Sequence, residues 1–198
     1  NDAMKLVVRN MVKDDVAFIF ATGKSYYDEF ISSIEDLNLK PYQRVVPYLE
    51  DMANALAASD LVIGSAGAIS LAEITALGKP SIIIPKAYTA ENHQEYNAKS
   101  IEKQGAGVAI LEKNLTDVSL NDAVTRLLGN REELLEMANK SKEIGKPEAI
   151  DLIYDEILKI YNANNKEKLH KKESKKSKKE ENTDTNVDLD KKEDTSSQ

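Results

Sequence analysis

Short apolar runs alternate along this chain with longer segments whose apolar residues recur every three to four positions. The short runs are typical of buried strands, and they predict strands at residues 16–21, 43–46, 60–64, 81–84 and 108–111. The longer segments have the spacing of amphipathic helices, and they predict helices at residues 1–13, 26–37, 51–58, 69–77, 92–104, 120–128, 131–141 and 148–161.

Continuous apolar strands that alternate with helices indicate a parallel sheet covered on both faces. The predicted fold class is therefore α/β, with a Rossmann-like, doubly wound parallel sheet of about five or six strands. In such sheets ligands bind beyond the carboxyl ends of the strands. Candidate binding residues are thus expected in the loops that follow Ala21, Val46, Gly64 and Ile84.

Charge is unevenly distributed along the 198 residues, whose net charge is −7. The segment from Lys166 onward holds ten lysines and nine acidic residues, so residues 1–165 keep 17 basic and 25 acidic side chains. An acidic body lacks the basic face that general nucleic-acid binding requires, so no nucleic-acid partner is predicted. The chain has no cysteine, which excludes disulfides and thiolate chemistry.

The last part of the chain differs in composition from the rest. From Lys166 onward the apolar residues are Leu169, Val187 and Leu189, too few to offset the entropy of ordering. We therefore predict a domain at residues 1–162 and a disordered Lys/Glu-rich tail at residues 163–198. The tail is interpreted as a solubilising segment, or as a weak attachment to anionic lipid.

The segment at residues 60–73 carries the sharpest chemical signal. A predicted strand ends at Gly64, and small residues then lead into a helix that begins near Ile69 or Ser70. Free backbone N–H groups at such a helix start favour a phosphate group. Glu73 shares the helix face of Ile69 and Ser70, where its carboxylate can accept hydrogen bonds from ribose hydroxyls. The alternative is that the small residues serve only close packing.

A second segment, residues 85–98, follows the next strand and so lies at the same edge. Its polar residues His93, Gln94 and Asn97 stand at the start of a helix, and amide side chains both donate to and accept from sugar hydroxyls. The alternative for His93 is a surface or capping residue. The only other histidine is His170, and the region has no Asp-x-Asp run, so neither a metal nor a cofactor is predicted.

Two weaker signals lie at this edge. Tyr48 and Leu49 follow the second strand, where an aromatic and an aliphatic side chain suit a flat base, although core packing is an equal alternative. Lys24 follows the first strand, and two interpretations of it are open. Its side chain lies near a phosphate, or it is simply exposed to solvent.

Together these segments resemble the C-terminal domain of the MurG family of glycosyltransferases. The matching motifs agree in order and spacing over about residues 1–161, and they are residues 48–52 (YLEDM), 65–73 (SAGAISLAE), 78–80 (GKP) and 93–98 (HQEYNA). The chain departs from the pattern at Ser65, where many members carry Arg, and this puts one contact to charge or to the interdomain cleft in doubt.

The resemblance implies a role for each matching residue in binding UDP-N-acetylglucosamine (UDP-GlcNAc). Tyr48 and Leu49 would line the uracil pocket, and Glu73 would hold the ribose. The turn at Gly67 and the first helical residues, Ala68, Ile69 and Ser70, would present hydrogen-bond donors to the diphosphate. In the second segment, Gln94 and Asn97 would read the GlcNAc hydroxyls, while His93 would support their loop.

The resemblance also implies a half-enzyme. Members of this family have two Rossmann-like domains (the GT-B arrangement), and the N-terminal domain supplies the acceptor site and the catalytic base. No catalytic residue is therefore expected in this chain, which begins at Asn1 inside a predicted helix and is interpreted as a fragment. The implied reaction is an inverting transfer of GlcNAc to a lipid-linked muramyl-pentapeptide acceptor. The implied location is the cytoplasm, with peripheral contact to the inner face of the cell membrane.

Three alternatives remain open at this point. In the first, the chain is a complete donor-binding subunit that works with a separate acceptor subunit. In the second, it belongs to a related glycosyltransferase with another lipid acceptor. The third is a non-enzymatic nucleotide-sugar sensor.

Overall fold

The structure is a computed structural model that describes residues 1–87, 92–163 and 165–166. The chain forms two compact units, Asn1–Pro147 and Glu148–Gln198. The predicted boundary at residue 162 stays a prediction, and the tail from residue 167 onward lies outside the described residues.

The first unit contains all five predicted strands, and each is short. They are β1 (Phe18–Ala21), β2 (Gln43–Val46), β3 (Val62–Gly64), β4 (Ser81–Ile83) and β5 (Gly107–Ala109). The helices that alternate with them or follow them are α1 (Met4–Lys13), α2 (Tyr27–Ser33), α3 (Met52–Ala58), α4 (Ala68–Ala76), α5 (His93–Lys103), α6 (Asp117–Gly129) and α7 (Arg131–Ile144). Two 3₁₀ turns, η1 (Lys24–Tyr26) and η3 (Glu112–Asn114), follow the first and the last strand.

All strand pairs are parallel, which confirms the predicted α/β fold class. They form two sheets, β1-β2 and β3-β4-β5, instead of the one continuous sheet that the sequence predicted. Phe18 pairs with Gln43 in the first sheet, and Ile82 lies between Ile63 and Val108 in the second. The prediction of one sheet was wrong because an apolar run indicates that a strand is buried but does not identify its neighbour.

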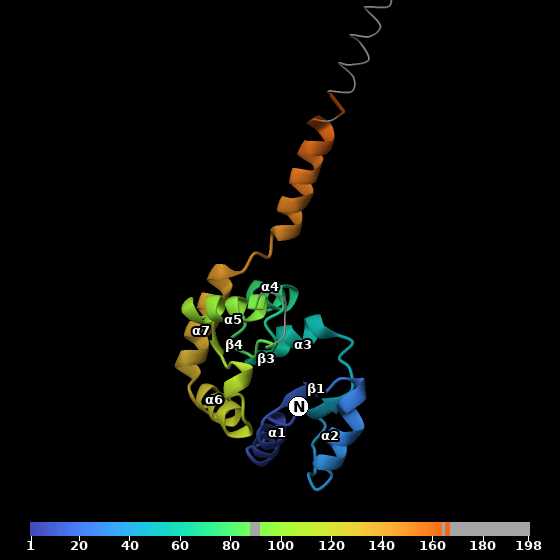
Figure 1. Cartoon of the computed structure of the whole chain (residues 1–198), viewed down its shortest axis with the longest axis vertical. Helices are drawn as coiled ribbons and strands as arrows, with labels where there is room; N and C mark the ends of the chain where they lie inside the picture. Colours follow the sequence, from blue (N-terminus) through green and yellow to red (C-terminus); the bar gives the residue numbers. More distant parts are fainter. Residues whose placement is uncertain (88–91, 164, 167–198) are drawn as a thin grey trace, which may run out of the picture. The chain divides into compact units, whose positions relative to one another are not determined.

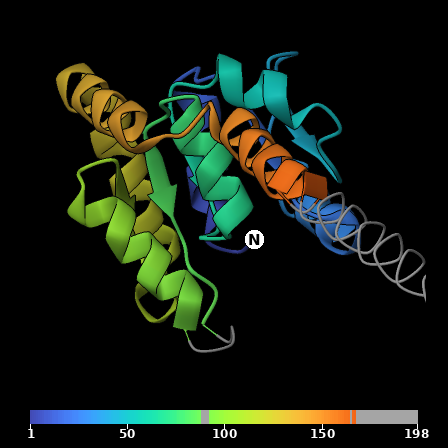
Figure 2. The same ribbon diagram turned by 90° about the horizontal axis from the view of Figure 1, so that it is seen from above.

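Helices cover both faces of the second sheet, as a doubly wound fold requires. Successive strand residues point to opposite faces, so Ile82 and Ile83 of β4 belong to different parts of the core. Ile82 packs with residues of α1, α6 and α7, whereas Ile83 packs with residues of α4 and α5. Figures 1 and 2 both show α4 and α5 next to β4.

Helix α1 links the two sheets through consecutive buried residues. Val7 joins the core of the second sheet with α6, and Figure 1 shows α1 and α6 side by side. Val8 joins a separate cluster with Phe30 of α2 and Val45 of β2. The Phe20 and Phe30 rings meet edge to face in this cluster, with centroids 4.9 Å apart. The two sheets thus share one helix, although no strand pairs across them in the part of the chain that the structure describes.

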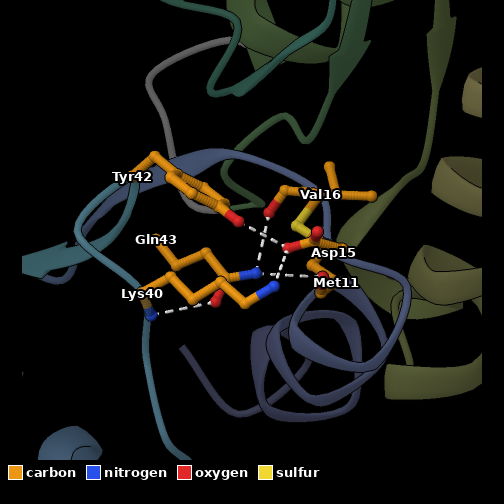
Figure 3. A network of polar contacts seen from close by, with 6 residues as sticks. All are labelled: Met11, Asp15, Val16, Lys40, Tyr42 and Gln43. Atoms are coloured by element: carbon orange, nitrogen blue, oxygen red, sulfur yellow. Dashed lines mark hydrogen bonds and ion pairs between the residues drawn. The ribbon is translucent and has the colours of Figure 1, made fainter.

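A buried glutamine fixes how the first sheet meets α1 (Figure 3). The Gln43 side chain is 2% exposed, and its Nε2 donates to the carbonyl oxygens of Met11 and Val16. Its Oε1 accepts a hydrogen bond from the backbone N–H of Lys40. One side chain therefore satisfies three backbone groups in the end of α1, the lead into β1 and the turn before β2.

The predicted helix at residues 26–37 is shorter than its apolar spacing indicated, because α2 ends at Ser33. The Ser33 hydroxyl donates to the Phe30 carbonyl, and the guanidinium of Arg9 donates to the Ser33 carbonyl at 2.8 Å. A long-range partner thus takes the carbonyl that the next turn of helix would have used. Ile34 is still buried, so its apolar spacing reflected core packing beyond the helix end.

The second unit contains a helical segment at residues 149–163, which agrees with the helix predicted at residues 148–161. Within the part of the chain that the structure describes, no helix combines the length and the apolar character that crossing a membrane requires.

Candidate functional site

The turn between β3 and α4 lies at the carboxyl edge of the second sheet. Gly67 precedes the first helical residue with extended backbone angles (φ −65°, ψ 137°), and no side chain caps the helix there. The N–H groups of the first helical turn therefore receive no hydrogen bond acceptor from the residue before the helix, an arrangement that suits an anion. Ala68, Ile69 and Ser70 of this first turn are all exposed.

The glycines of this turn are not required by the fold. A Cβ added to Gly64 would meet nothing within 4 Å, and one added to Gly67 would meet only the Ser70 hydroxyl, at 3.9 Å. Neither residue has a positive φ. Elsewhere a glycine is structurally necessary, since a Cβ at Gly145 would lie 2.3 Å from the Thr75 carbonyl oxygen. The turn before α4 is thus open on the side where a ligand would approach.

Glu73 lies one turn further along α4, on its exposed side. Leu71, Ile74 and Thr75 form the buried side of this helix, while the Ile69 side chain is 78% exposed. Ile69 and Glu73 are four residues apart, so they share the solvent face, as the sequence predicted. A carboxylate and an uncapped helix start therefore border the same open surface.

Helix α5 brings the second predicted segment to this turn. The Asn97 Nδ2 donates to the carbonyl oxygen of Ala66 at 3.1 Å, which ties α5 to the residues just before α4. Gln94 Oε1 accepts from the backbone N–H of Lys86 at 3.0 Å, which ties the start of α5 to the loop after β4. His93 is the first residue of α5 and is exposed.

These bonds leave one half of each amide for a ligand. No hydrogen bond to a described residue uses Gln94 Nε2 or Asn97 Oδ1. Asn97 thus uses its amide nitrogen at the residues before α4, and Gln94 uses its amide oxygen at the loop after β4.

Tyr48 and Leu49 lie in the loop between β2 and α3. Tyr48 is 66% exposed and Leu49 is half-buried, so Tyr48 is not a core residue. Asp51 caps α3 by accepting from the Asn54 side chain at 2.7 Å and from its backbone N–H at 3.2 Å, and these bonds lower the pKa of the Asp51 carboxyl. The loop follows β2 as the α4 turn follows β3, but no described hydrogen bond joins Tyr48 or Leu49 to α4.

Glu112 was not singled out in the sequence, but in the structure it lies beside the loop that follows β4. Its Oε2 accepts from the backbone N–H of Ala87 at 2.8 Å, across 25 residues of chain. Glu112 also borders a pocket of about 110 Å³ with Lys86, Asn92 and Glu95. The available signal was its position directly after the fifth predicted strand, at the carboxyl edge that the fold rule identifies.

Lys24 is exposed at the start of η1, after β1. Over residues 1–87, 92–163 and 165–166, no group of three or more His, Cys, Asp or Glu side chains is arranged to hold a metal ion.

Comparison with known proteins identifies a family and near relatives. The model of the glycosyltransferase family 28 C-terminal domain matches residues 1–153. The chain is 83% identical over 166 residues to the UDP-N-acetylglucosamine--N-acetylmuramyl-(pentapeptide) pyrophosphoryl-undecaprenol N-acetylglucosamine transferase of Clostridioides difficile strain 630, which covers 84% of this chain and 41% of that protein. The protein of the same name from Acetivibrio thermocellus is 48% identical over 150 residues, covering 75% of this chain and 40% of that protein.

Among solved structures, Acinetobacter baumannii MurG superposes with a TM-score of 0.66 at 28% identity, over 79% of this chain and 46% of that one. A UDP-N-acetylglucosamine 2-epimerase, with a TM-score of 0.58 at 17% identity, shares the fold alone. The chain thus spans less than half the length of the curated relatives that it matches.

Proposed function

Because the chain belongs to the glycosyltransferase family 28 C-terminal domain family, we propose that it is the donor-binding part of an N-acetylglucosamine transferase. The donor is UDP-GlcNAc, and the acceptor is undecaprenyl-pyrophosphoryl-N-acetylmuramoyl-pentapeptide, so the reaction converts lipid I to lipid II in peptidoglycan synthesis. The observation that carries this proposal is the 83% identity to the C. difficile protein named for this transfer.

The geometry supports a nucleotide diphosphate at the start of α4. The uncapped N–H groups of Ala68, Ile69 and Ser70 face the diphosphate, and Gly67 lets the phosphate approach the backbone. Glu73, exposed on the same helix face, accepts hydrogen bonds from the ribose hydroxyls. Tyr48 and Leu49 contact the uracil ring from the loop after β2.

The sugar is read by the polar residues of α5. Gln94 Nε2 donates to a GlcNAc hydroxyl and Asn97 Oδ1 accepts from another, while their remaining amide atoms keep the surrounding loops in place. His93 supports this segment from the first position of α5.

In the transfer step the acceptor hydroxyl attacks the anomeric carbon of GlcNAc with inversion, and UDP leaves. This chain contributes fixed dipoles at the α4 start, which stabilise the negative charge that develops on the leaving diphosphate. The base that deprotonates the acceptor belongs to a part of the enzyme outside this chain. The lipid-linked acceptor places the reaction at the cytoplasmic face of the cell membrane, with which the enzyme makes peripheral contact.

Calorimetric titration of the chain with UDP-GlcNAc, UDP-glucose and ADP-glucose tests the donor site. We expect the two UDP sugars to bind and ADP-glucose not to bind. Loss of the carboxylate in Glu73→Ala removes charge-assisted hydrogen bonds to ribose, so the Kd for UDP-GlcNAc should rise by roughly 10- to 100-fold. Glu136→Ala, which removes an exposed carboxylate from α7, is the matched control and should bind as the unsubstituted chain does. Equal affinity for UDP and ADP sugars, or an unchanged Kd in Glu73→Ala, would contradict the proposed site.

The acceptor is tested separately in a chimaera that joins the chain to the N-terminal part of the C. difficile relative. Transfer of radiolabelled GlcNAc to a lipid-linked muramyl-pentapeptide supports the proposal. Transfer only to a different lipid acceptor would favour a related glycosyltransferase instead.

A further inference from the structure

The loop that leaves β4 is held from two sides by side chains. Parallel pairing ends near Ile83, although the Ile84 N–H still donates to the Gly64 carbonyl of β3 at 2.8 Å. Pro85 has no N–H, so the first loop amides beyond the sheet are those of Lys86 and Ala87. Gln94 Oε1 accepts from the N–H of Lys86, and Glu112 Oε2 accepts from the N–H of Ala87. Two successive amides are therefore satisfied by side chains from different elements, α5 and η3.

The backbone that carries Glu112 is bonded to the second sheet. It is the first residue of η3, which is the next element after β5. Just before it, the N–H of Ile110 donates to the Ile83 carbonyl at 2.9 Å, so the chain leading to Glu112 is still bonded to β4. The carboxylate thus connects the loop after β4 to the neighbouring strand of the rigid sheet.

The position of Lys86 and Ala87 bears directly on the sugar-reading residues. Gln94 bonds to Lys86 with Oε1, so displacement of the loop would displace the amide and its Nε2 donor. Glu112 and Glu95 both border the pocket of about 110 Å³ beside this loop. In contrast, the α4 turn and Glu73 make no hydrogen bond to Glu112 in the part of the chain that the structure describes.

We propose that Glu112 is a positioning residue for donor-sugar recognition: its bond to the Ala87 N–H sets the loop that orients Gln94 toward the sugar. The inference rests on the proposed function and deepens it, because it gives Glu112 a part in the difference in affinity between UDP-GlcNAc and UDP. Glu112 itself does not touch the reacting atoms.

The test compares UDP with UDP-GlcNAc by calorimetry in the full chain and its variants. In Glu112→Ala the Kd for UDP-GlcNAc should rise by about three- to tenfold, since an exposed charged hydrogen bond is lost, while the Kd for UDP should not change. In Glu112→Gln the side-chain oxygen can still accept from Ala87, so most of the UDP-GlcNAc affinity should return. The Ala87 amide resonance in a ¹⁵N NMR spectrum should move in Glu112→Ala and return toward its original position in Glu112→Gln.

Glu102→Ala is the matched control, because exposed Glu102 accepts from the backbone N–H of Ala109 at 2.9 Å, whereas the N–H groups of Lys86 and Ala87 donate to Gln94 and Glu112. It should leave both Kd values unchanged. An equal loss of UDP and UDP-GlcNAc affinity in Glu112→Ala would indicate a merely structural role and overturn the inference, as would an unchanged UDP-GlcNAc affinity. If the unsubstituted chain binds neither UDP nor UDP-GlcNAc, the proposed function fails and the inference fails with it.

Discussion

At the scale of single residues, Gly67 is a position where the fold does not require glycine. A Cβ there meets only the Ser70 hydroxyl at 3.9 Å, so Gly67→Ala should cost less than about 1 kcal/mol of stability as a helix-cap change. The same Cβ would stand where the proposed diphosphate approaches the backbone. We expect the UDP-GlcNAc Kd, measured by calorimetry, to rise about tenfold or more.

Gly145 is a position where the fold does require glycine, and it provides the control for Gly67→Ala. Its added Cβ would overlap the Thr75 carbonyl oxygen, so Gly145→Ala should lower the free energy of unfolding by about 1–3 kcal/mol in urea denaturation. Because Gly145 lies at the end of α7, the folded variant should keep its UDP-GlcNAc affinity. A Gly67→Ala variant that binds as tightly as the unsubstituted chain would contradict the placement of the diphosphate.

The hydrogen bonds of Asp15 lead to a prediction about how stability depends on pH. Its carboxylate accepts from the Lys40 ammonium at 2.5 Å and from the Tyr42 hydroxyl at 2.7 Å, and these two bonds lower the pKa of Asp15 (Figure 3). A lowered folded-state pKa stabilises the protein above the unfolded value of about 3.9, and this stability is lost as pH falls through the folded-state pKa. Asp15→Asn removes the charge but suits the left-handed backbone (φ 60°).

The variant should therefore be slightly less stable than the unsubstituted chain at pH 7, because the pair is exposed and the effect small. The gap in urea midpoint should narrow as the pH falls below the unfolded carboxyl value and through the lowered folded-state pKa of Asp15. A gap that stays constant from pH 7 to pH 2.5 would show that the Asp15 charge is not its cause.

At the scale of elements, Gln43 tests how α1, β1 and β2 are joined. Gln43→Ala leaves the Val16 carbonyl and the Lys40 N–H without this part-buried partner, and the Met11 carbonyl keeps only its bond from the Val16 N–H. We expect a loss of about 2–4 kcal/mol in the free energy of unfolding, measured in urea. The control is Gln104→Ala, whose exposed amide bonds within its own helix, and it should change stability by less than about 0.5 kcal/mol. Similar losses in the two variants would contradict the role given to Gln43.

At the scale of the whole molecule, every proposed donor contact lies in the unit Asn1–Pro147. A ligand that binds only the folded state stabilises it by mass action, about 2.7 kcal/mol at 100 times Kd. UDP-GlcNAc at that concentration should raise the Tm by several degrees in a thermal-shift assay. At the same concentration, a variant whose Kd is tenfold weaker, as proposed for Glu73→Ala, should show about half of that stabilisation. ADP-glucose should leave the Tm unchanged, and an equal shift with both ligands would argue against a uridine site.

The sequence by itself determined the element types, their order and the family. Short apolar runs and helical spacing depend on which residues are buried, and burial is recorded locally in the order of apolar residues. The motifs at residues 48–52, 65–73 and 93–98 were sufficient to indicate the MurG family, and the family match over residues 1–153 confirms that relationship. The roles assigned to the individual site residues stay predictions.

Only the tertiary structure decided which distant groups meet. The end of α2 at Ser33 depends on Arg9, a partner 24 residues away, and the loop at Ala87 depends on Glu112, 25 residues away. The division of the strands into two sheets and the use of Val7 and Val8 in separate cores are likewise set by packing. The physical reason is that a hydrogen bond or a strand pair is chosen by the positions of both partners in space, which local spacing along the chain does not record.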